Sequence, residues 1–136
     1  MTLFRNTELT TNRILGEVLF LSGLLFILHS LASKFFWYWH YWWFDIVMHL
    51  LGGFILGLLF TWFIIRVGVS WRKRVWFYIV ALIVLAITIW WEIFEYVNDM
   101  VREINYISDT TIDIMLGVLG ASLAYMFIRK KMIDEE

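Results

Sequence analysis

The sequence predicts an all-α fold, an integral membrane four-helix bundle that forms one domain over residues 1–136. Two observations support this prediction. The chain is 62% hydrophobic and only 17% charged, whereas a soluble domain is about 45–50% apolar and about 25% charged. It also contains four apolar stretches, each close to the ~20 residues that a helix needs to cross a bilayer.

The same composition excludes several other classes of protein. The absence of cysteine excludes a disulfide scaffold and a cysteine-ligated metal site. The high apolar content excludes intrinsic disorder. A net charge of −1 gives no indication of nucleic-acid binding. We therefore expect the lipid bilayer to be the main partner, with multi-pass insertion in the cell (cytoplasmic) membrane.

The expected spans cover about residues 14–32, 44–65, 75–97 and 110–128. Nine of the 11 basic residues flank these spans on one side, and only Lys34 and Arg102 lie on the other. Cytoplasmic loops carry an excess of lysine and arginine, so both termini are predicted to be cytoplasmic. An aromatic segment, residues 35–44, leads into the second span from the outer side. Its composition is typical of an interfacial aromatic belt, and the alternative is a platform for a lipid or a sugar.

Most of the acidic residues gather near the outer ends of the spans. Residues three or four apart share one face of a helix, and three pairs with this spacing occur at about the same depth. The pairs are Asp45 with His49, Glu92 with Glu95, and Asp109 with Asp113. His29, near the outer end of the first span, could join them. The pattern predicts one polar cluster beneath the outer boundary.

Small residues continue the same faces towards the other side of the membrane. Gly53 and Gly57 follow His49 at intervals of four, and Gly117, Gly120 and Ala124 follow Asp113. Small residues let membrane helices approach each other closely. The second and fourth spans are therefore expected to pack through these faces, with the polar pairs buried between helices.

The acidic residues also have simpler structural explanations. Asp109 follows Ser108 where a helix is expected to start, and an acid there caps backbone N–H groups and meets the positive end of the helix dipole. Asp45, near the expected start of the second span, could cap a helix in the same way. Glu92 and Glu95 lie near a helix C-terminus, where the dipole disfavours negative charge. These two therefore need a cation, a proton or a hydrogen-bond donor.

A divalent metal ion would satisfy several of these groups together, since carboxylate and imidazole ligands suit Zn, Mn or Fe and carboxylate-rich sites suit Mg. Glu92 and Glu95 are also the candidate catalytic residues, because a spare carboxylate can act as a general base. A proton-sharing network remains an adequate alternative, and no other cofactor is expected. The candidate metal ligands are Asp45, His49, Glu92, Glu95, Asp109 and Asp113.

Together these motifs resemble the VanZ-like membrane proteins and, more closely, the related YjdF-like inner-membrane family. The resemblance covers about residues 44–125 and includes Trp91 before Glu92 and the pair Gly117 and Gly120. Ile46 stands where VanZ-like proteins often have lysine, and Glu95 and Gly117 stand where many have glutamine and asparagine. These departures favour the YjdF-like branch. The resemblance implies a multi-pass membrane protein with a polar site and implies no particular reaction.

Three functions stay open at this point. The first is a metal-dependent membrane enzyme that acts on a lipid headgroup or a lipid-linked substrate. The second is a non-catalytic membrane module that binds a partner in the cell envelope. The third is an ion or proton carrier, since acids within a membrane commonly mark such pathways. With four spans per chain, a carrier would require a homo-oligomer.

Overall fold

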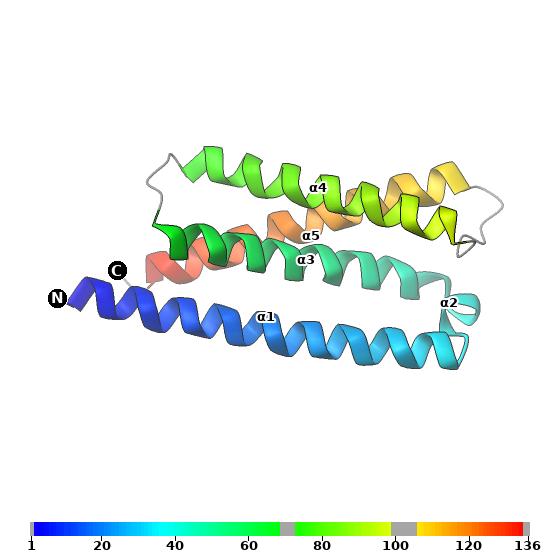
Figure 1. The fold of residues 1–136 in the computed structure, drawn as a ribbon, viewed down its shortest axis with the longest axis horizontal. Helices are drawn as coiled ribbons and strands as arrows, with labels where there is room; N and C mark the ends of the chain where they lie inside the picture. The colour runs from blue at the N-terminus through cyan, green and yellow to red at the C-terminus, as the bar shows by residue number, and fades with distance from the viewer. Residues whose placement is uncertain (1, 69–72, 99–105, 135–136) are drawn as a thin grey trace.

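The computed structural model describes residues 2–68, 73–98 and 106–134. Four long helices lie side by side, and one short helix crosses one end of the bundle (Figure 1). The helices are α1 (Thr2–Lys34), α2 (Trp37–His40), α3 (Trp42–Val67), α4 (Lys73–Val97) and α5 (Tyr106–Asp134). The all-helical fold class predicted from the sequence is confirmed.

The long helices contain four segments of 24 to 26 residues that are long and apolar enough to cross a membrane. Two helices extend well beyond the predicted spans. Helix α1 includes the polar stretch 6–12, and α5 begins at Tyr106 rather than at residue 110. Polar residues continue a helix as readily as apolar ones once its backbone hydrogen bonds have started. The helices of the structure therefore extend beyond the apolar stretches on which the predicted spans were based.

Large apolar side chains cover the outside of the bundle. Phe20 and Phe26 on α1 are each 71% exposed, and Leu82 on α4 is 63% exposed. Exposed apolar area on this scale is foreign to a soluble monomer. It is the surface that a bilayer solvates, because lipid tails are as apolar as these side chains.

Helix α3 is the central element, and it packs against α1, α4 and α5. Its closest neighbour is α5, which lies behind it in the view of Figure 1. A Cβ atom added at Gly57 would lie 2.6 Å from the Cα atom of Ala121, and one added at Gly53 would overlap the backbone of Gly117. Only glycine permits so close an approach, and the packing predicted for the small-residue faces is confirmed.

Helix α1 packs against the bundle through one apolar cluster at each end of its length. Towards the start of α1, Ile14 packs with Leu58 and Ile128, and all three are at most 1% exposed. At the opposite end, Ala32 of α1 packs with Phe44 and Met48 of α3. These contacts hold α1 against α3 along its length, and they leave the rest of α1 to face lipid.

The aromatic segment folds as a tight turn around α2. Phe36 adopts a left-handed conformation with φ 59°, which lets the chain reverse between α1 and α3. The rings of Trp37 and Tyr38 then pack edge-on against Phe44, with centroids 5.7 and 5.1 Å from it. Trp42 beside them is 81% exposed. One side of the segment therefore belongs to the core, and the other side is open.

The helix order separates charge between the two ends of the bundle. Helix α1 begins, and α5 ends, at the same end (Figure 1). Arg66 at the end of α3 and Arg74 at the start of α4 lie at this end as well. The acidic pairs lie at the other end, where α3 and α5 begin and α4 finishes. The bundle therefore has one basic end and one acidic end.

Candidate functional site

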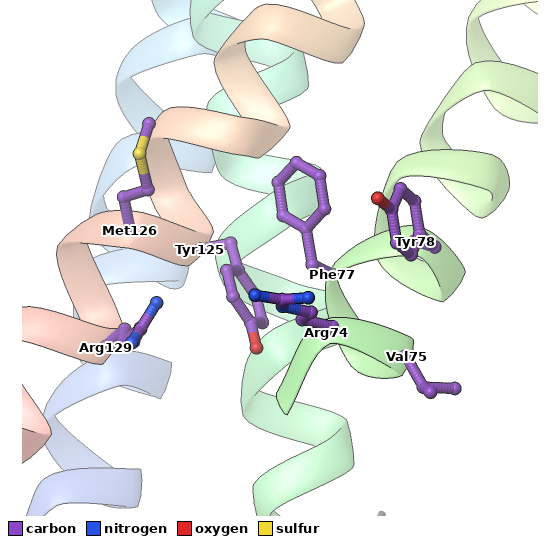
Figure 2. A pocket seen from close by; sticks show the side chains of 7 residues that line it. All are labelled: Arg74, Val75, Phe77, Tyr78, Tyr125, Met126 and Arg129. Carbon is purple, nitrogen blue, oxygen red and sulfur yellow. The ribbon is translucent and has the colours of Figure 1, made fainter. Parts of the chain in front are cut away.

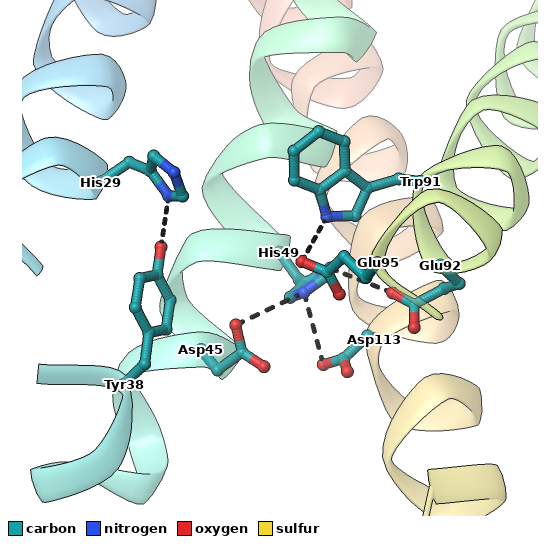
Figure 3. Close-up of polar contacts among 8 residues, drawn as sticks. All are labelled: His29, Tyr38, Asp45, His49, Trp91, Glu92, Glu95 and Asp113. Carbon is teal, nitrogen blue, oxygen red and sulfur yellow. Dashed lines mark hydrogen bonds and ion pairs between the residues drawn. The ribbon is translucent and has the colours of Figure 1, made fainter. Parts of the chain in front are cut away.

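Three helices contribute side chains to a polar cluster at the acidic end of the bundle. Helix α3 supplies Asp45 and His49 from its first two turns. Helix α4 supplies Glu92 and Glu95 from its last two turns, and α5 supplies Asp113 from its second turn. Figure 3 shows these side chains converging from the three helices. We call them the acidic cluster.

The imidazole of His49 lies at the centre of the acidic cluster. Its Nε2 atom is 3.5 Å from Oδ1 of Asp45 and 4.0 Å from Oδ1 of Asp113. Its Nδ1 atom is 3.8 Å from Oε1 of Glu92. Each ring nitrogen therefore faces at least one carboxylate, and the ring separates the carboxylates into two sets.

Burial differs strongly among the members of the cluster. Glu92 is 4% exposed and Asp113 is 3% exposed. The side chain of Asp45 is 38% exposed, and Glu95 is half-buried. The cluster therefore has a closed inner part and an open outer part near the helix ends.

Two buried oxygen atoms in this region have no hydrogen-bond partner. The first is Oε1 of Glu92 on α4, and the second is the hydroxyl of Thr110, which α5 places beside Glu92. Both atoms are inaccessible to solvent. A buried carboxylate oxygen left unpaired costs on the order of several kcal/mol. The nearest groups of the chain are Nδ1 of His49, 3.8 Å from Oε1, and Thr110 beside Glu92, so Oε1 has room for a closer ligand.

Glu95 differs from Glu92 in having a fixed donor. The indole Nε1 of Trp91, one turn earlier on α4, donates a hydrogen bond of 2.9 Å to Oε1 of Glu95. This bond orients the carboxylate through Oε1, and the second carboxylate oxygen, Oε2, takes no part in it. Trp91 is 37% exposed, so the pair lies where the cluster opens.

The cluster contains two sets of atoms that could bind a metal ion. One set comprises Asp45, His49 and Asp113, and the other comprises His49, Glu92 and Glu95. Within each set the ligand atoms lie within 4.8 Å of one another. Bonds of about 2.0–2.2 Å to a transition metal place its ligands at most about 4.4 Å apart. A small inward movement would bring either set onto one ion.

Asp45 and Asp109 both lie in the first turn of a helix, where the positive end of the helix dipole favours an acid. The N-cap residue of α3 is Tyr41, which makes no side-chain capping bond, so Asp45 is in the first turn but is not itself the cap. Helix α5 begins at Tyr106, so Asp109 also lies within the first turn rather than at the cap. Asp109 belongs to neither metal-binding set, and its charge acts on Glu92 and Asp113 from the edge of the cluster.

His29 does not belong to either set and has a different partner. A hydrogen bond of 2.8 Å joins its Nδ1 atom to the hydroxyl of Tyr38 on α2 (Figure 3). Burial of Tyr38, together with the charges of Asp45 and Glu95, raises the pKa of its phenol. The hydroxyl therefore stays protonated, and it ties α1 to α2 beside the acidic cluster. Arg102, which the sequence analysis placed on the outer side with Lys34, lies outside the described residues.

The sequence analysis gave Thr110, Trp91 and Tyr38 no role in this region, although Trp91 belongs to the motif that carries the family resemblance. Thr110 directly follows Asp109, and its spacing of three from Asp113 placed it on the same helix face. Trp91 precedes Glu95 by four residues, the spacing at which an indole can reach a carboxylate. Tyr38 carried no such signal, because its position depends on the turn at Phe36.

Comparison with known proteins gives one match. A family model described as "Predicted membrane protein (DUF2238)" matches residues 5–132. No curated protein and no solved structure matches the chain. The match includes every member of the acidic cluster, and the description of the family names no reaction, ligand or partner.

Proposed function

The chain belongs to the DUF2238 family of predicted membrane proteins, a YjdF-like family, and from the geometry of its acidic cluster we propose that it is a metal-dependent membrane enzyme. The ion is one divalent cation, and its candidate ligands form two alternative sets, Asp45 with His49 and Asp113 or His49 with Glu92 and Glu95. The single observation that carries the proposal is the buried Oε1 atom of Glu92, which has no hydrogen-bond partner.

Charge balance supports a cation at this position. Four carboxylates surround one imidazole, and in the part of the chain that the structure describes only His49 forms an ion pair with any of them. Carboxylates crowded at low dielectric cannot all remain ionised without compensation. A divalent ion supplies two positive charges and ligates the unpaired oxygen. Protons are the alternative compensation, and a bound ion would displace them.

The imidazole is suited to hold such an ion with a fixed orientation. A histidine that binds a metal through one nitrogen usually donates its other N–H to a carboxylate. His49 meets this condition from either side, because Nε2 faces Asp45 and Asp113 while Nδ1 faces Glu92. The same carboxylates can therefore act as ligands or as orienting groups. This mixed donor set suits Zn, Mn or Fe, and Mg if the carboxylates dominate.

The depth of the cluster supports a substrate that is itself part of the membrane. A helix rises about 1.5 Å per residue, which places Glu95 about 3 Å and His49 about 10 Å below the nearest helix end. This is the level of lipid headgroups and of the first acyl carbons. The substrate would be a lipid headgroup or a lipid-linked molecule, whose phosphate the cation would bind. Glu95, half-buried and already oriented by Trp91, is the candidate general base, and Glu92 is a candidate ligand.

Topology belongs to the same proposal. The basic end carries Arg66, Arg74 and Arg129, and the positive-inside rule places such an end in the cytoplasm. The acidic cluster would then open towards the outer leaflet of the cytoplasmic membrane.

Metal analysis and thermal melting test the proposal on the full chain, purified in detergent without chelator. We expect about one equivalent of a divalent metal in the parent and a lower melting temperature after chelator is added. Glu92→Gln should contain less metal and should respond much less to chelator. Glu17→Gln is the matched control, because it makes the same substitution within a span at the basic end. It should keep the metal content and the chelator response of the parent.

The same experiment separates the alternative functions. A proton-sharing network in a non-catalytic module predicts no bound metal, no effect of chelator, and a Glu92→Gln variant at least as stable as the parent. That result would overturn the metal proposal. An ion carrier would need polar groups across the whole bundle. Between the acidic cluster and the basic end, the buried polar side chains of the described residues are only the hydroxyls of Thr11, Thr61 and Thr88.

A further inference from the structure

A second polar site lies at the basic end of the bundle, far from the acidic cluster. A cavity of about 800 Å³ opens between the first turns of α4 and the last turns of α5. Its lining comprises Arg74, Val75, Phe77, Tyr78, Tyr125, Met126 and Arg129. Figure 2 shows Arg74 and Arg129 approaching from different helices, with Tyr125 between them in this view. We call this cavity the basic pocket.

The two arginines are available to bind a ligand. Both are exposed, and within the part of the chain that the structure describes neither forms a salt bridge with a carboxylate. A guanidinium group presents a planar set of N–H donors that matches a phosphate, often through two parallel hydrogen bonds. Two such groups around one cavity indicate an anion with several oxygens.

The other walls of the basic pocket are apolar or aromatic. Phe77 and Tyr125 pack edge-on with ring centroids 5.5 Å apart, which fixes the pocket floor between α4 and α5. Val75 and Met126 add aliphatic surface at the rim, and both are exposed. A free inorganic anion would gain nothing from such walls. A molecule that has an anionic head and an apolar body would contact both kinds of surface.

The position of the pocket identifies the source of that molecule. Arg74 is the first residue of the third span, and Arg129 is the last but one of the fourth. Both guanidinium groups are therefore attached where the helices meet the headgroup region. Basic pockets between transmembrane helices at this level are suited to anionic lipid headgroups. We propose that the basic pocket binds the phosphate of one anionic phospholipid from the leaflet at the basic end.

This proposal is independent of the metal centre, since it uses none of the same residues. Lipid bound here would join the start of α4 to the end of α5. It would therefore strengthen the contact between these two helices at the end opposite the acidic cluster. An anionic lipid should stabilise the folded protein increasingly as its concentration rises above its dissociation constant, because it binds the folded state and not the separated helices.

The test measures lipid binding by native mass spectrometry and thermal melting at 0.15 M salt. The full chain in neutral detergent is titrated with phosphatidylglycerol, with phosphatidylcholine of the same acyl chains, and with inorganic phosphate. The variants are Arg74→Gln, Arg129→Gln and the double substitution. Lys130→Gln is the matched control, because Lys130 is exposed beside Arg129 and does not line the pocket.

We expect one phosphatidylglycerol to bind more tightly than the others, and each arginine substitution to weaken it about tenfold. Lys130→Gln should change the affinity less than twofold, because its charge is screened at this salt concentration. The variant with lysine at both arginine positions should fold and bind more tightly than the double glutamine variant. Equal binding of phosphatidylcholine, or equal losses in Lys130→Gln, would overturn the proposal. Competition by inorganic phosphate at similar concentrations would identify a free-anion site instead and overturn the lipid assignment.

Discussion

Gly53 and Gly52 are adjacent on α3, yet replacing each with alanine should have opposite effects on stability. A Cβ atom at Gly52 meets nothing within 4 Å. A Cβ atom at Gly53 lies 2.6 Å from both the Cα atom and the carbonyl carbon of Gly117, and still closer to the carbonyl oxygen. The obstacle at Gly53 is backbone, so no side-chain rotation can relieve it.

The magnitudes follow from this difference. Ordinary van der Waals contact begins at 3.4 Å, so Gly53→Ala must separate α3 from α5 by roughly 1 Å. Overpacking of this kind costs about 1–3 kcal/mol of unfolding free energy. Gly52→Ala should instead add about 0.5–1 kcal/mol, because alanine favours the helical conformation over glycine. We expect the two variants to differ by about 1.5–4 kcal/mol.

The assay is reversible unfolding in mixed detergent micelles, with helix content as the signal and the parent alongside. Metal content gives a second reading, because α3 carries His49 and α5 carries Asp113. Separating the helices lengthens the 4.0 Å distance between Nε2 of His49 and Oδ1 of Asp113, so Gly53→Ala should also weaken any ion bound there. Equal stabilities for the two variants would refute the close contact between α3 and α5 and the reasoning built on it.

Two further predictions concern topology and pH. Reporter fusions after Lys34 and after Lys73 should report opposite sides of the membrane, and the same side for both would contradict the four-span arrangement. The raised pKa of Tyr38 means that the folded protein keeps a proton that the unfolded chain releases above about pH 10. Stability should therefore fall as the pH rises past 10. Melting at pH 9 and pH 11 should show a smaller fall for Tyr38→Phe than for the parent, and equal falls would refute the raised pKa.

The sequence predicted the features that depend on helical periodicity alone. Asp45 and His49 are four residues apart, and Gly53 and Gly57 continue the same face, so one helix aligns them whatever surrounds it. Successive spans run in opposite directions, so the end of the third span and the start of the fourth lie at the same side of the bilayer. Glu92, near the end of one, and Asp113, near the start of the other, could therefore be predicted to lie at the same depth. These two facts are enough to predict that α3, α4 and α5 share a polar region.

The features that depend on packing between elements were beyond this reasoning. The hydrogen bond between His29 and Tyr38 requires the reversal at Phe36, and a left-handed phenylalanine has no signature in the sequence. The basic pocket requires Arg74 and Arg129 to point into one cavity, which the positive-inside pattern does not specify. The fourth long helix was expected to start at Ser108 and Asp109, but α5 starts two residues earlier, at Tyr106.

The pairing of α3 with α5 also has a consequence for the order in which the protein assembles. Helix α4 lies between them in the chain, so the glycine face of α3 has no partner until the last helix has been synthesised. Until then Asp45 and His49 remain unsheltered, and a charged side chain in the bilayer costs about 2.5–3.5 kcal/mol at the centre and less near the interface. A nascent chain that stops before Tyr106 would hold three inserted helices with this cost unrelieved. Arrival of α5 therefore completes both the core and the acidic cluster, because the same helix supplies the partner of the glycine face and Asp113.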